Sequence, residues 1–275
     1  MSLIIGLVGA WLLILVGMLL KGGTIMGVVN LPAFLMVIGG TAGALIASFG
    51  LKNTMSMFRL TTKVAMKERP ETRPETIRTL VDFSEKARRE GLLVLEDDAR
   101  KVDDPYMARG VRLVVDGTDP ELVKDILETE IESMEDRHTR NQRMFQQGGA
   151  MAPTIGILAT VLSLVSVLQH LDQPDTLGPA ISAAFLATFY GVAFANIALY
   201  PVANALKGRT EQEVDERTLV IEGILSIQSG DNPRILAEKL WSFMPPDMRP
   251  DRDADGGADR EAPSGASGER LAEAA

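Results

Sequence analysis

The sequence has 275 residues and a formal net charge of −9. This acidic balance, with no basic patch among aromatic residues, argues against a nucleic-acid binder. The chain has no cysteine, so disulfide and thiol chemistry are excluded, and His138 and His170 have no clustered carboxylates beside them. We therefore expect no bound metal and no cofactor, and a structural role for both histidines.

Two apolar segments open the chain. Residues 2–20 are long enough to cross a membrane, have no basic stretch before them and no cleavage site after them, and so predict a retained helix. Residues 31–51 form a second span, with Gly39, Gly43 and Ala47 at four-residue spacing. Such a stripe favours close helix packing. Residues 1–51 are thus a membrane unit of two helices.

The next 99 residues, 52–150, alternate apolar and charged positions at helical spacing. A helix over 75–89 buries one face and ends before Gly91, for which we expect a left-handed cap. Asp104-Pro105 and Asp119-Pro120 each predict the start of a helix. The second of these continues to Gly148-Gly149, where we expect a hinge into the third span.

Residues 151–206 hold the third and fourth spans, joined by the link LDQPDTL. Neither span has an acidic or basic residue, but both have small and hydroxyl residues: Thr154, Gly156, Thr160, Ser163, Ser166, Ser182, Thr188, Gly191 and Asn196. Packing alone explains such residues in many membrane helices, and the lining of an ion path is the other explanation. Antiparallel helices would bring Thr160 and Thr188 to similar depth.

An ion path needs a group that gains and loses charge. None of the four spans contains Asp, Glu, Lys or Arg. We therefore expect a partner chain to supply the titrating carboxylate.

The chain ends with two parts of different composition. Residues 207–245 predict two further helices, over 209–229 and from Asn232-Pro233. Residues 246–275 are rich in Pro, Gly, Ala and charge, and we expect them to be disordered.

The positive residues nearest the spans set the orientation. Lysines and arginines follow the second and fourth spans, whereas the other two links carry only Lys21 against Asp172 and Asp175. Both termini and residues 52–150 should then be cytoplasmic. The fold class that follows is an all-α membrane protein with four transmembrane helices, a helical cytoplasmic domain between the second and third, and a C-terminal cytoplasmic tail.

Six stretches, in order, carry a resemblance: EKARREGLLVLED, VDGTDPELVKDILETEIESMEDRHTR, APTIGILATVL, LGPAISAAFLATFYGVAFAN, YPVANAL and IEGILSIQSGDNPRILAEKL. With the four-span layout, they make the chain resemble the MotA/PomA flagellar stator subunits of the MotA/TolQ/ExbB family. The resemblance implies a pentameric ring in the bacterial inner membrane around a MotB/PomB-like single-span partner that supplies the ion-binding Asp. It implies ion flow that turns the rotor through a FliG-type switch protein, contact with membrane lipid, and no enzymatic activity.

The resemblance also implies roles for eight residues. They are Thr160 and Thr188 at the ion path, Pro153 and Pro201 in gating and coupling, and Arg88, Arg89, Glu96 and Asp97 in contact with the rotor. Hydroxyls at both threonine positions favour sodium, and otherwise the ion is a proton. The chain departs from the family pattern at Ala159, Ser163 and Ala187.

Two alternatives remain. A TolQ/ExbB-like energy transducer usually has three spans, so the two spans before residue 52 favour the stator. A membrane scaffold without conduction is the other. The sequence has no P-loop, nucleophile elbow or metal-ligand spacing, so we expect no enzyme.

Overall fold

The computed structural model describes residues 2–65, 71–169, 171–172 and 174–250, and these contain helices and turns but no strand. The elements in chain order are α1 (Ser2–Leu20), η1 (Ile25–Val28), α2 (Leu31–Phe34), η2 (Leu35–Gly39), α3 (Gly40–Phe49), α4 (Leu51–Leu60), η3 (Thr61–Ala65), α5 (Arg73–Glu90), η4 (Leu92–Val94), α6 (Leu95–Ala99), α7 (Pro105–Val115), α8 (Pro120–Leu168), α9 (Pro174–Ala193), η5 (Phe194–Leu199), α10 (Tyr200–Ser229), α11 (Pro233–Trp241) and η6 (Pro246–Met248).

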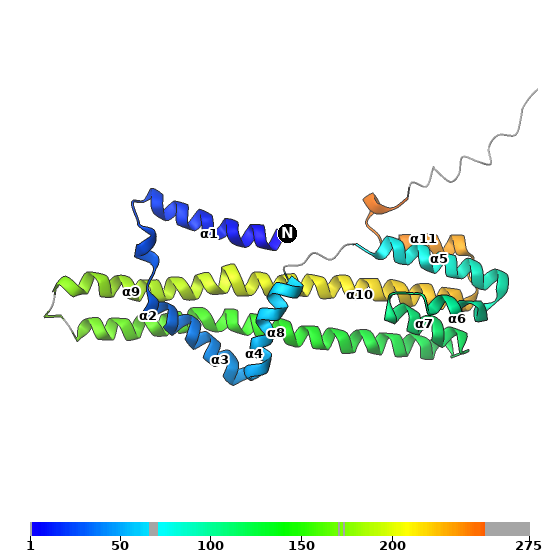
Figure 1. The fold of residues 1–275 in the computed structure, drawn as a ribbon, viewed down its shortest axis with the longest axis horizontal. Helices are drawn as coiled ribbons and strands as arrows, with labels where there is room; N and C mark the ends of the chain where they lie inside the picture. The colour runs from blue at the N-terminus through cyan, green and yellow to red at the C-terminus, as the bar shows by residue number, and fades with distance from the viewer. Residues whose placement is uncertain (1, 66–70, 170, 173, 251–275) are drawn as a thin grey trace, which may run out of the picture.

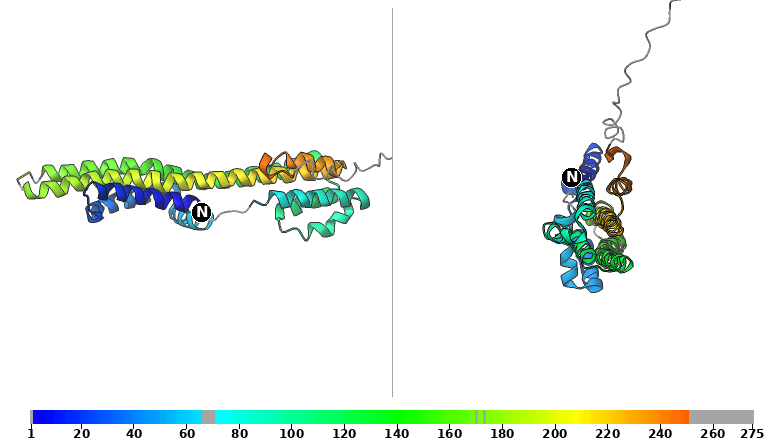
Figure 2. Two further views of the ribbon diagram at one scale, coloured as in Figure 1. Left: turned by 90° about the horizontal axis from the view of Figure 1, so that it is seen from above. Right: turned by 90° about the vertical axis from the view of Figure 1, so that its right-hand side faces the viewer.

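Two very long antiparallel helical rods form the axis of the molecule (Figure 1). One rod is α8, and the other is the continuous run of α9, η5 and α10. The N-terminal helices α1 to α4 lie along one half of the rods, and α5, α6, α7 and α11 surround the other half (Figures 1 and 2). The two rods therefore pass through two different surroundings.

Four helices in the described part of the chain are long and apolar enough to span a membrane. They are Leu3–Leu20, Ile25–Phe49, and parts of the two rods Pro120–Leu168 and Leu177–Ser229. The expected all-α, four-span fold is confirmed.

The second span packs on the rods by a face other than the one expected. Val37, Thr41 and Leu45 are buried there, and the Thr41 hydroxyl donates to the Val37 carbonyl. A β-carbon on Gly39 or Gly43 would meet nothing within 4 Å. Among the residues that the structure describes, the small-residue stripe therefore has no packing partner, and the close packing expected of it is not found there.

The hinge expected at Gly148-Gly149 is wrong, because α8 is one unbroken helix through both residues. The two glycines instead allow close packing. A β-carbon at Gly149 would lie 2.7 Å from the ring of Tyr200, and one at Gly148 would lie 3.1 Å from Leu45. Glycine in this helix interior serves contact between helices rather than bending.

The half of the rods beyond the membrane spans is held by an apolar core. Ile77 of α5, Leu127 of α8, Leu219 of α10 and Leu236 of α11 are all fully buried in it. The core thus joins residues from before the third span and after the fourth. As expected, Asp104 and Asp119 cap their helices, each accepting from the backbone N–H two residues on at 3.0 Å.

The end of α5 differs from the sequence expectation. Gly91 has a positive φ of 87° but a ψ of 165°, so it is extended rather than left-handed helical. This backbone is open to glycine and turns the chain sharply into η4. Of the tail, residues 246–250 include the short turn η6, whereas residues 251–275, and His170, lie outside the described residues.

Candidate functional site

Within the membrane spans, α8 and α9 approach each other through glycine and alanine residues. A β-carbon at Gly191 would lie 2.5 Å from the carbonyl oxygen of Ala152, and one at Gly156 would lie 3.0 Å from that of Ala187. No side chain larger than hydrogen fits either place without displacing the backbone. For these glycines the packing explanation of small residues in membrane helices holds.

Next to this contact, the structure brings Thr160 and Thr188 together. Their hydroxyl oxygens are 2.6 Å apart. The Thr160 oxygen also lies 2.9 Å from the Ala184 carbonyl oxygen of the opposite helix and 3.0 Å from the Gly156 carbonyl oxygen of its own. The expected match in depth is confirmed, and four oxygens gather where the helices are closest.

This oxygen cluster, defined as the Thr160 and Thr188 hydroxyls with the Gly156 and Ala184 carbonyls, has the chemistry of a cation ligand set. Each hydroxyl has one hydrogen, so when Thr160 donates to a carbonyl, Thr188 is the donor between the two hydroxyls. All four oxygens can instead turn lone pairs toward a hard cation that has lost part of its water shell. Both threonines are half-buried, so the cluster is reachable from the edge of the helix pair.

Three other polar side chains of these spans bond within their own helix. Thr154 donates to the Met151 carbonyl, Ser163 to that of Ala159 and Asn196 to that of Val192. Such bonds to the preceding turn are common for hydroxyl residues in membrane helices. These residues look alike in the sequence, and the bond between the third and fourth spans is what distinguishes Thr160 and Thr188 from Thr154, Ser163 and Asn196.

Two of the three departures from the family pattern, Ala159 and Ala187, lie on the packing side of the helices. Ala159 and Ala187 are buried against Ala33 and Val37 of the second span. They fill the contact between spans, and larger residues would push those helices apart.

Pro153 and Pro201 lie at two weak points of the rods. Pro153 is inside α8, about two turns before Thr160. Pro201 is the second residue of α10, which begins where the π-helical turn η5 ends. A proline has no N–H to complete the helical ladder, and π-turns also interrupt it. Pro201 lines a cavity of about 450 Å³ between the fourth span and Leu3 and Leu7 of α1.

The four expected rotor-facing charges gather at the end of the molecule farthest from the α8–α9 turn. Arg88 and Arg89 occupy the last turn of α5, and Glu96 and Asp97 the first turn of α6 (Figure 1). All four side chains are exposed. The sharp turn at Gly91 brings the two ends together on one surface.

Two of these charges pair weakly within their own helices. Arg89 lies 3.4 Å from Glu85, and Glu96 lies 2.7 Å from Arg100. Exposed pairs of this kind contribute about 0–1 kcal/mol, so they can exchange partners at little cost.

One pair behind this surface holds it in shape. Lys86 of α5 donates to Asp98 of α6 at 2.7 Å. This hydrogen bond holds the pKa of Asp98 below its usual range and raises the pKa of Lys86. The pair therefore links the two helices that carry the four charges.

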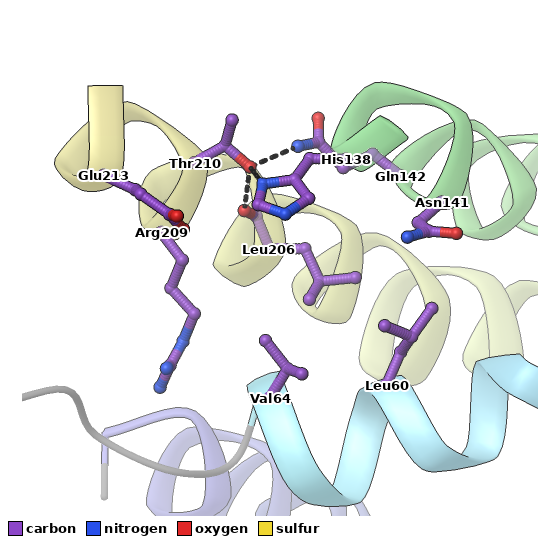
Figure 3. A pocket seen from close by; sticks show the side chains of 9 residues that line it. All are labelled: Leu60, Val64, His138, Asn141, Gln142, Leu206, Arg209, Thr210 and Glu213. Atoms are coloured by element: carbon purple, nitrogen blue, oxygen red, sulfur yellow. Dashed lines mark hydrogen bonds between the residues drawn. The ribbon is translucent and has the colours of Figure 1, made fainter. Parts of the chain in front are cut away.

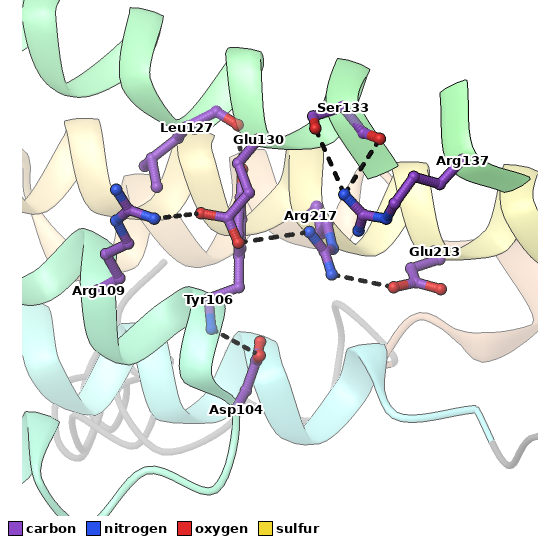
Figure 4. A network of polar contacts seen from close by, with 9 residues as sticks. All are labelled: Asp104, Tyr106, Arg109, Leu127, Glu130, Ser133, Arg137, Glu213 and Arg217. Atoms are coloured by element: carbon purple, nitrogen blue, oxygen red, sulfur yellow. Dashed lines mark hydrogen bonds and ion pairs between the residues drawn. The ribbon is translucent and has the colours of Figure 1, made fainter. Parts of the chain in front are cut away.

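A second network, not foreseen from the sequence, joins α7, α8 and α10 (Figure 4). Glu130 accepts from Arg109 at 3.0 Å and lies 3.8 Å from Arg217. The Arg217 guanidinium lies 4.8 Å from the centre of the Tyr106 ring. Burial raises the pKa of Tyr106, whose hydroxyl donates to the Leu127 carbonyl. These contacts hold the distal domain, which is formed by α5, α6, α7 and α11 around the half of the rods beyond the membrane spans, to α8 and α10.

A small cavity of about 120 Å³, lined mainly by polar residues, lies between α8 and α10 beside Leu60 and Val64 (Figure 3). Gln142 donates to the Thr210 hydroxyl at 2.9 Å, and the ring nitrogen Nδ1 of His138 lies 3.3 Å from the same oxygen. Leu60 of α4 closes one side. Polar residues at core-facing positions were the available sequence signal for this site, and the contacts of His138 fit a structural role. Among the described residues, no cluster of His, Cys, Asp or Glu could hold a metal.

Comparison with known proteins gives matches along nearly the whole described chain. The model of the MotA/TolQ/ExbB proton channel family matches residues 98–218, and that of the motility protein A N-terminal region matches residues 4–91. Motility protein A of Bacillus subtilis is 39% identical over 246 residues, covering 88% of this chain and 90% of that protein. Chemotaxis protein PomA of Vibrio alginolyticus is 32% identical, covering 89% and 95%.

Two solved structures are similar as well. The C. jejuni MotAB structure superposes with a TM-score of 0.85 at 31% identity, covering 91% of this chain and 98% of that one. The flagellar MotAB stator complex from Bacillus subtilis gives 0.83 at 38% identity, covering 90% and 97%.

Proposed function

The chain belongs to the MotA/TolQ/ExbB proton channel family as a flagellar motor stator subunit, and we propose that with a MotB-like partner it couples inward ion flow to torque on the rotor. Its four apolar helices make it a multi-pass protein of the inner membrane. The observation that carries the proposal is the oxygen cluster around Thr160 and Thr188, in spans without any acidic or basic side chain.

The partner supplies the charge that these spans lack. An ion path through a neutral wall needs one group that binds and releases the ion, and buried carboxylates in membranes commonly have that use. A single-span MotB/PomB-like protein with an Asp in its span meets the requirement. Similar solved complexes are named MotAB, which supports such a partner.

Sodium is the ion we propose, with the proton as the second candidate. A sodium ion must have its lost hydration replaced by oxygens, and the cluster offers four from each chain. A proton passes along water and needs no such set. Ala159 and Ala187, two of the three departures from the family pattern, pack toward the second span, and the oxygen cluster forms beside them.

Several chains together enclose the path. Many large apolar side chains of the third and fourth spans are exposed in the single chain, among them Ile157, Val161, Leu162 and Phe185. Neighbouring copies, the partner and lipid would cover them, in a pentameric ring. Two spans before residue 52, matching the motility protein A N-terminal region, support a stator over a TolQ/ExbB-like transducer.

The distal charges meet the rotor. With both termini and residues 52–150 cytoplasmic, Arg88, Arg89, Glu96 and Asp97 face a FliG-type switch protein. Contacts that form and break at each step need charges that steer and are individually weak, and these exposed pairs have that property.

The test is the rotation speed of tethered cells in which this protein is the sole stator. Replacing external sodium by potassium at fixed pH should slow the motor, and a protonophore should affect it much less. Undiminished rotation without sodium, together with arrest by the protonophore, would establish protons as the ion.

A further inference from the structure

A basic groove lies where the second span leaves the membrane. It is a surface hollow of about 530 Å³ lined by Phe49 and Asn53 on one side and by Arg140, Arg143 and Met144 of α8 on the other. Phe49 is the last residue of α3, and at Gly50, with its positive φ of 81°, the chain turns into α4. The groove is therefore at the depth where an apolar span ends.

The position along α8 gives the same depth. Counting back from Leu168, a hydrocarbon core of about 20 residues ends near Gly149. Arg143 and Arg140 are six and nine residues further on, about 9 and 14 Å along the helix. The headgroup layer is roughly 5–8 Å thick, and the long arginine side chain can reach back into it.

The two arginines are free to bind a ligand. Arg140 and Arg143 are exposed, and within the described residues neither makes a hydrogen bond or an ion pair, although Asp136 is one turn before Arg140. Arg137, at the edge of the groove, is instead held by the Ser133 hydroxyl and carbonyl (Figure 4). In a chain of net charge −9, a groove with three arginines and no carboxylate in its lining is a local reversal of sign.

We propose that this groove binds the headgroup phosphate of an acidic phospholipid. Guanidinium groups match phosphate oxygens two by two, which favours phosphate over a single point charge. Phe49 and Met144 offer an apolar wall beside the arginines, suited to the first carbons of acyl chains. Free phosphate would leave that wall unused. This site goes beyond ion conduction, and only its leaflet, the cytoplasmic one, rests on the proposed orientation.

The test uses the full-length protein in neutral detergent, titrated with phosphatidylglycerol or phosphatidylcholine and followed by native mass spectrometry at fixed ionic strength. The wild type should prefer phosphatidylglycerol. The variant Arg140→Gln/Arg143→Gln should lose about 30-fold in phosphatidylglycerol affinity, and clearly less in affinity for phosphatidylcholine, whose choline offsets the phosphate charge. The matched control, Arg78→Gln/Arg234→Gln, removes the same charge from exposed positions of the distal domain and should bind as the wild type does.

The variant Arg140→Lys/Arg143→Lys keeps the positive charge but loses the planar guanidinium that binds two phosphate oxygens at once. Its affinity for phosphatidylglycerol should lie between those of the wild type and the glutamine variant. Melting temperatures show that each variant is folded. Equal losses in the groove and control variants would mean general charge attraction and overturn the proposal. Displacement of the lipid by millimolar inorganic phosphate would also overturn the proposal. A changed subunit number with unchanged lipid affinity would assign the groove to a neighbouring chain.

Discussion

The membrane half and the distal half of the two rods are held together by different means. In the membrane half, glycine and alanine bring backbones into contact, and hydroxyls bond to carbonyls. In the distal half, large apolar side chains form a core, and Glu130 bridges two arginines. Lipid offers no hydrophobic drive for helix association, so close contact must supply it there, whereas water drives burial in the distal half.

The difference also separates two tasks. The membrane half has no charge of its own and offers only oxygens, so it suits passage of an ion brought to it. The distal half concentrates charge on an exposed surface. Because α8 is one helix of 49 residues, about 74 Å long, a movement at one end has a continuous element along which to reach the other.

The largest effect is expected from a substitution at the α8–α9 contact in the membrane half of the rods. Gly191→Ala would place a β-carbon 2.5 Å from the Ala152 carbonyl oxygen. We expect a loss of about 1–3 kcal/mol from overpacking, seen as a lower melting temperature of the purified protein. Gly208→Ala in α10, where a β-carbon meets nothing within 4 Å, is the control and should be neutral or stabilising. Equal melting temperatures would mean that the α8–α9 contact is looser than described.

A charge reversal at the exposed Arg88 tests the proposed rotor-facing surface and should leave the fold unchanged. Arg88→Glu should weaken the rotor contact about twofold to fivefold, because exposed pairs are individually weak, and swimming should fall accordingly. Membrane insertion and partner binding should remain. The same change at the exposed Arg234 of α11 is the control. Partial rescue by a reversed rotor charge would confirm the contact, whereas loss of assembly would assign Arg88 to folding.

Removing the bridge between helices tests how the distal half is held. Glu130→Gln leaves Arg109 and Arg217 without their shared carboxylate, and we expect a loss of about 1 kcal/mol. Glu128→Gln removes only an exposed pair with Lys124 and should change the melting temperature little. If the two variants melt alike, the network is a surface feature.

The smallest effect is a pH dependence. The folded-state pKa of Asp98 is depressed by Lys86, so the pair stabilises the fold above the unfolded pKa of about 3.9 and this contribution is lost as the pH falls. Asp98→Asn should therefore lower the melting temperature by about 1–2 °C at neutral pH, with no difference near pH 2. The exposed Asp103 provides the control. A difference that persists in acid would have another cause.

Local chemistry made much of the fold readable from the sequence. Long apolar segments without charged residues predicted the four spans. The pairs Asp104-Pro105 and Asp119-Pro120 predicted the first residues of two helices. The hinge predicted at Gly148-Gly149 is absent from α8, because packing against Leu45 and Tyr200 outweighs the low helix propensity of the two glycines.

What lay beyond the sequence depends on which residues meet across helices. Thr160 and Ser163 look alike in the chain, yet only the structure sets one against Thr188 and the other against its own helix. Glu130 and Arg217 are far apart in sequence, so no local pattern predicts their pairing.

We propose that the ion flow that drives the motor passes through the oxygen cluster, and that assembly of the stator does not depend on this cluster. Thr160→Ala removes one oxygen and a cross-helix bond while leaving Gly156 and Gly191 in contact. The most direct measurement counts fluorescent stators at single motors while recording the torque of each motor. We predict an unchanged stator count with rotation abolished or sharply reduced. Torque per stator equal to that of the wild type would contradict the account and make Thr160 a packing residue.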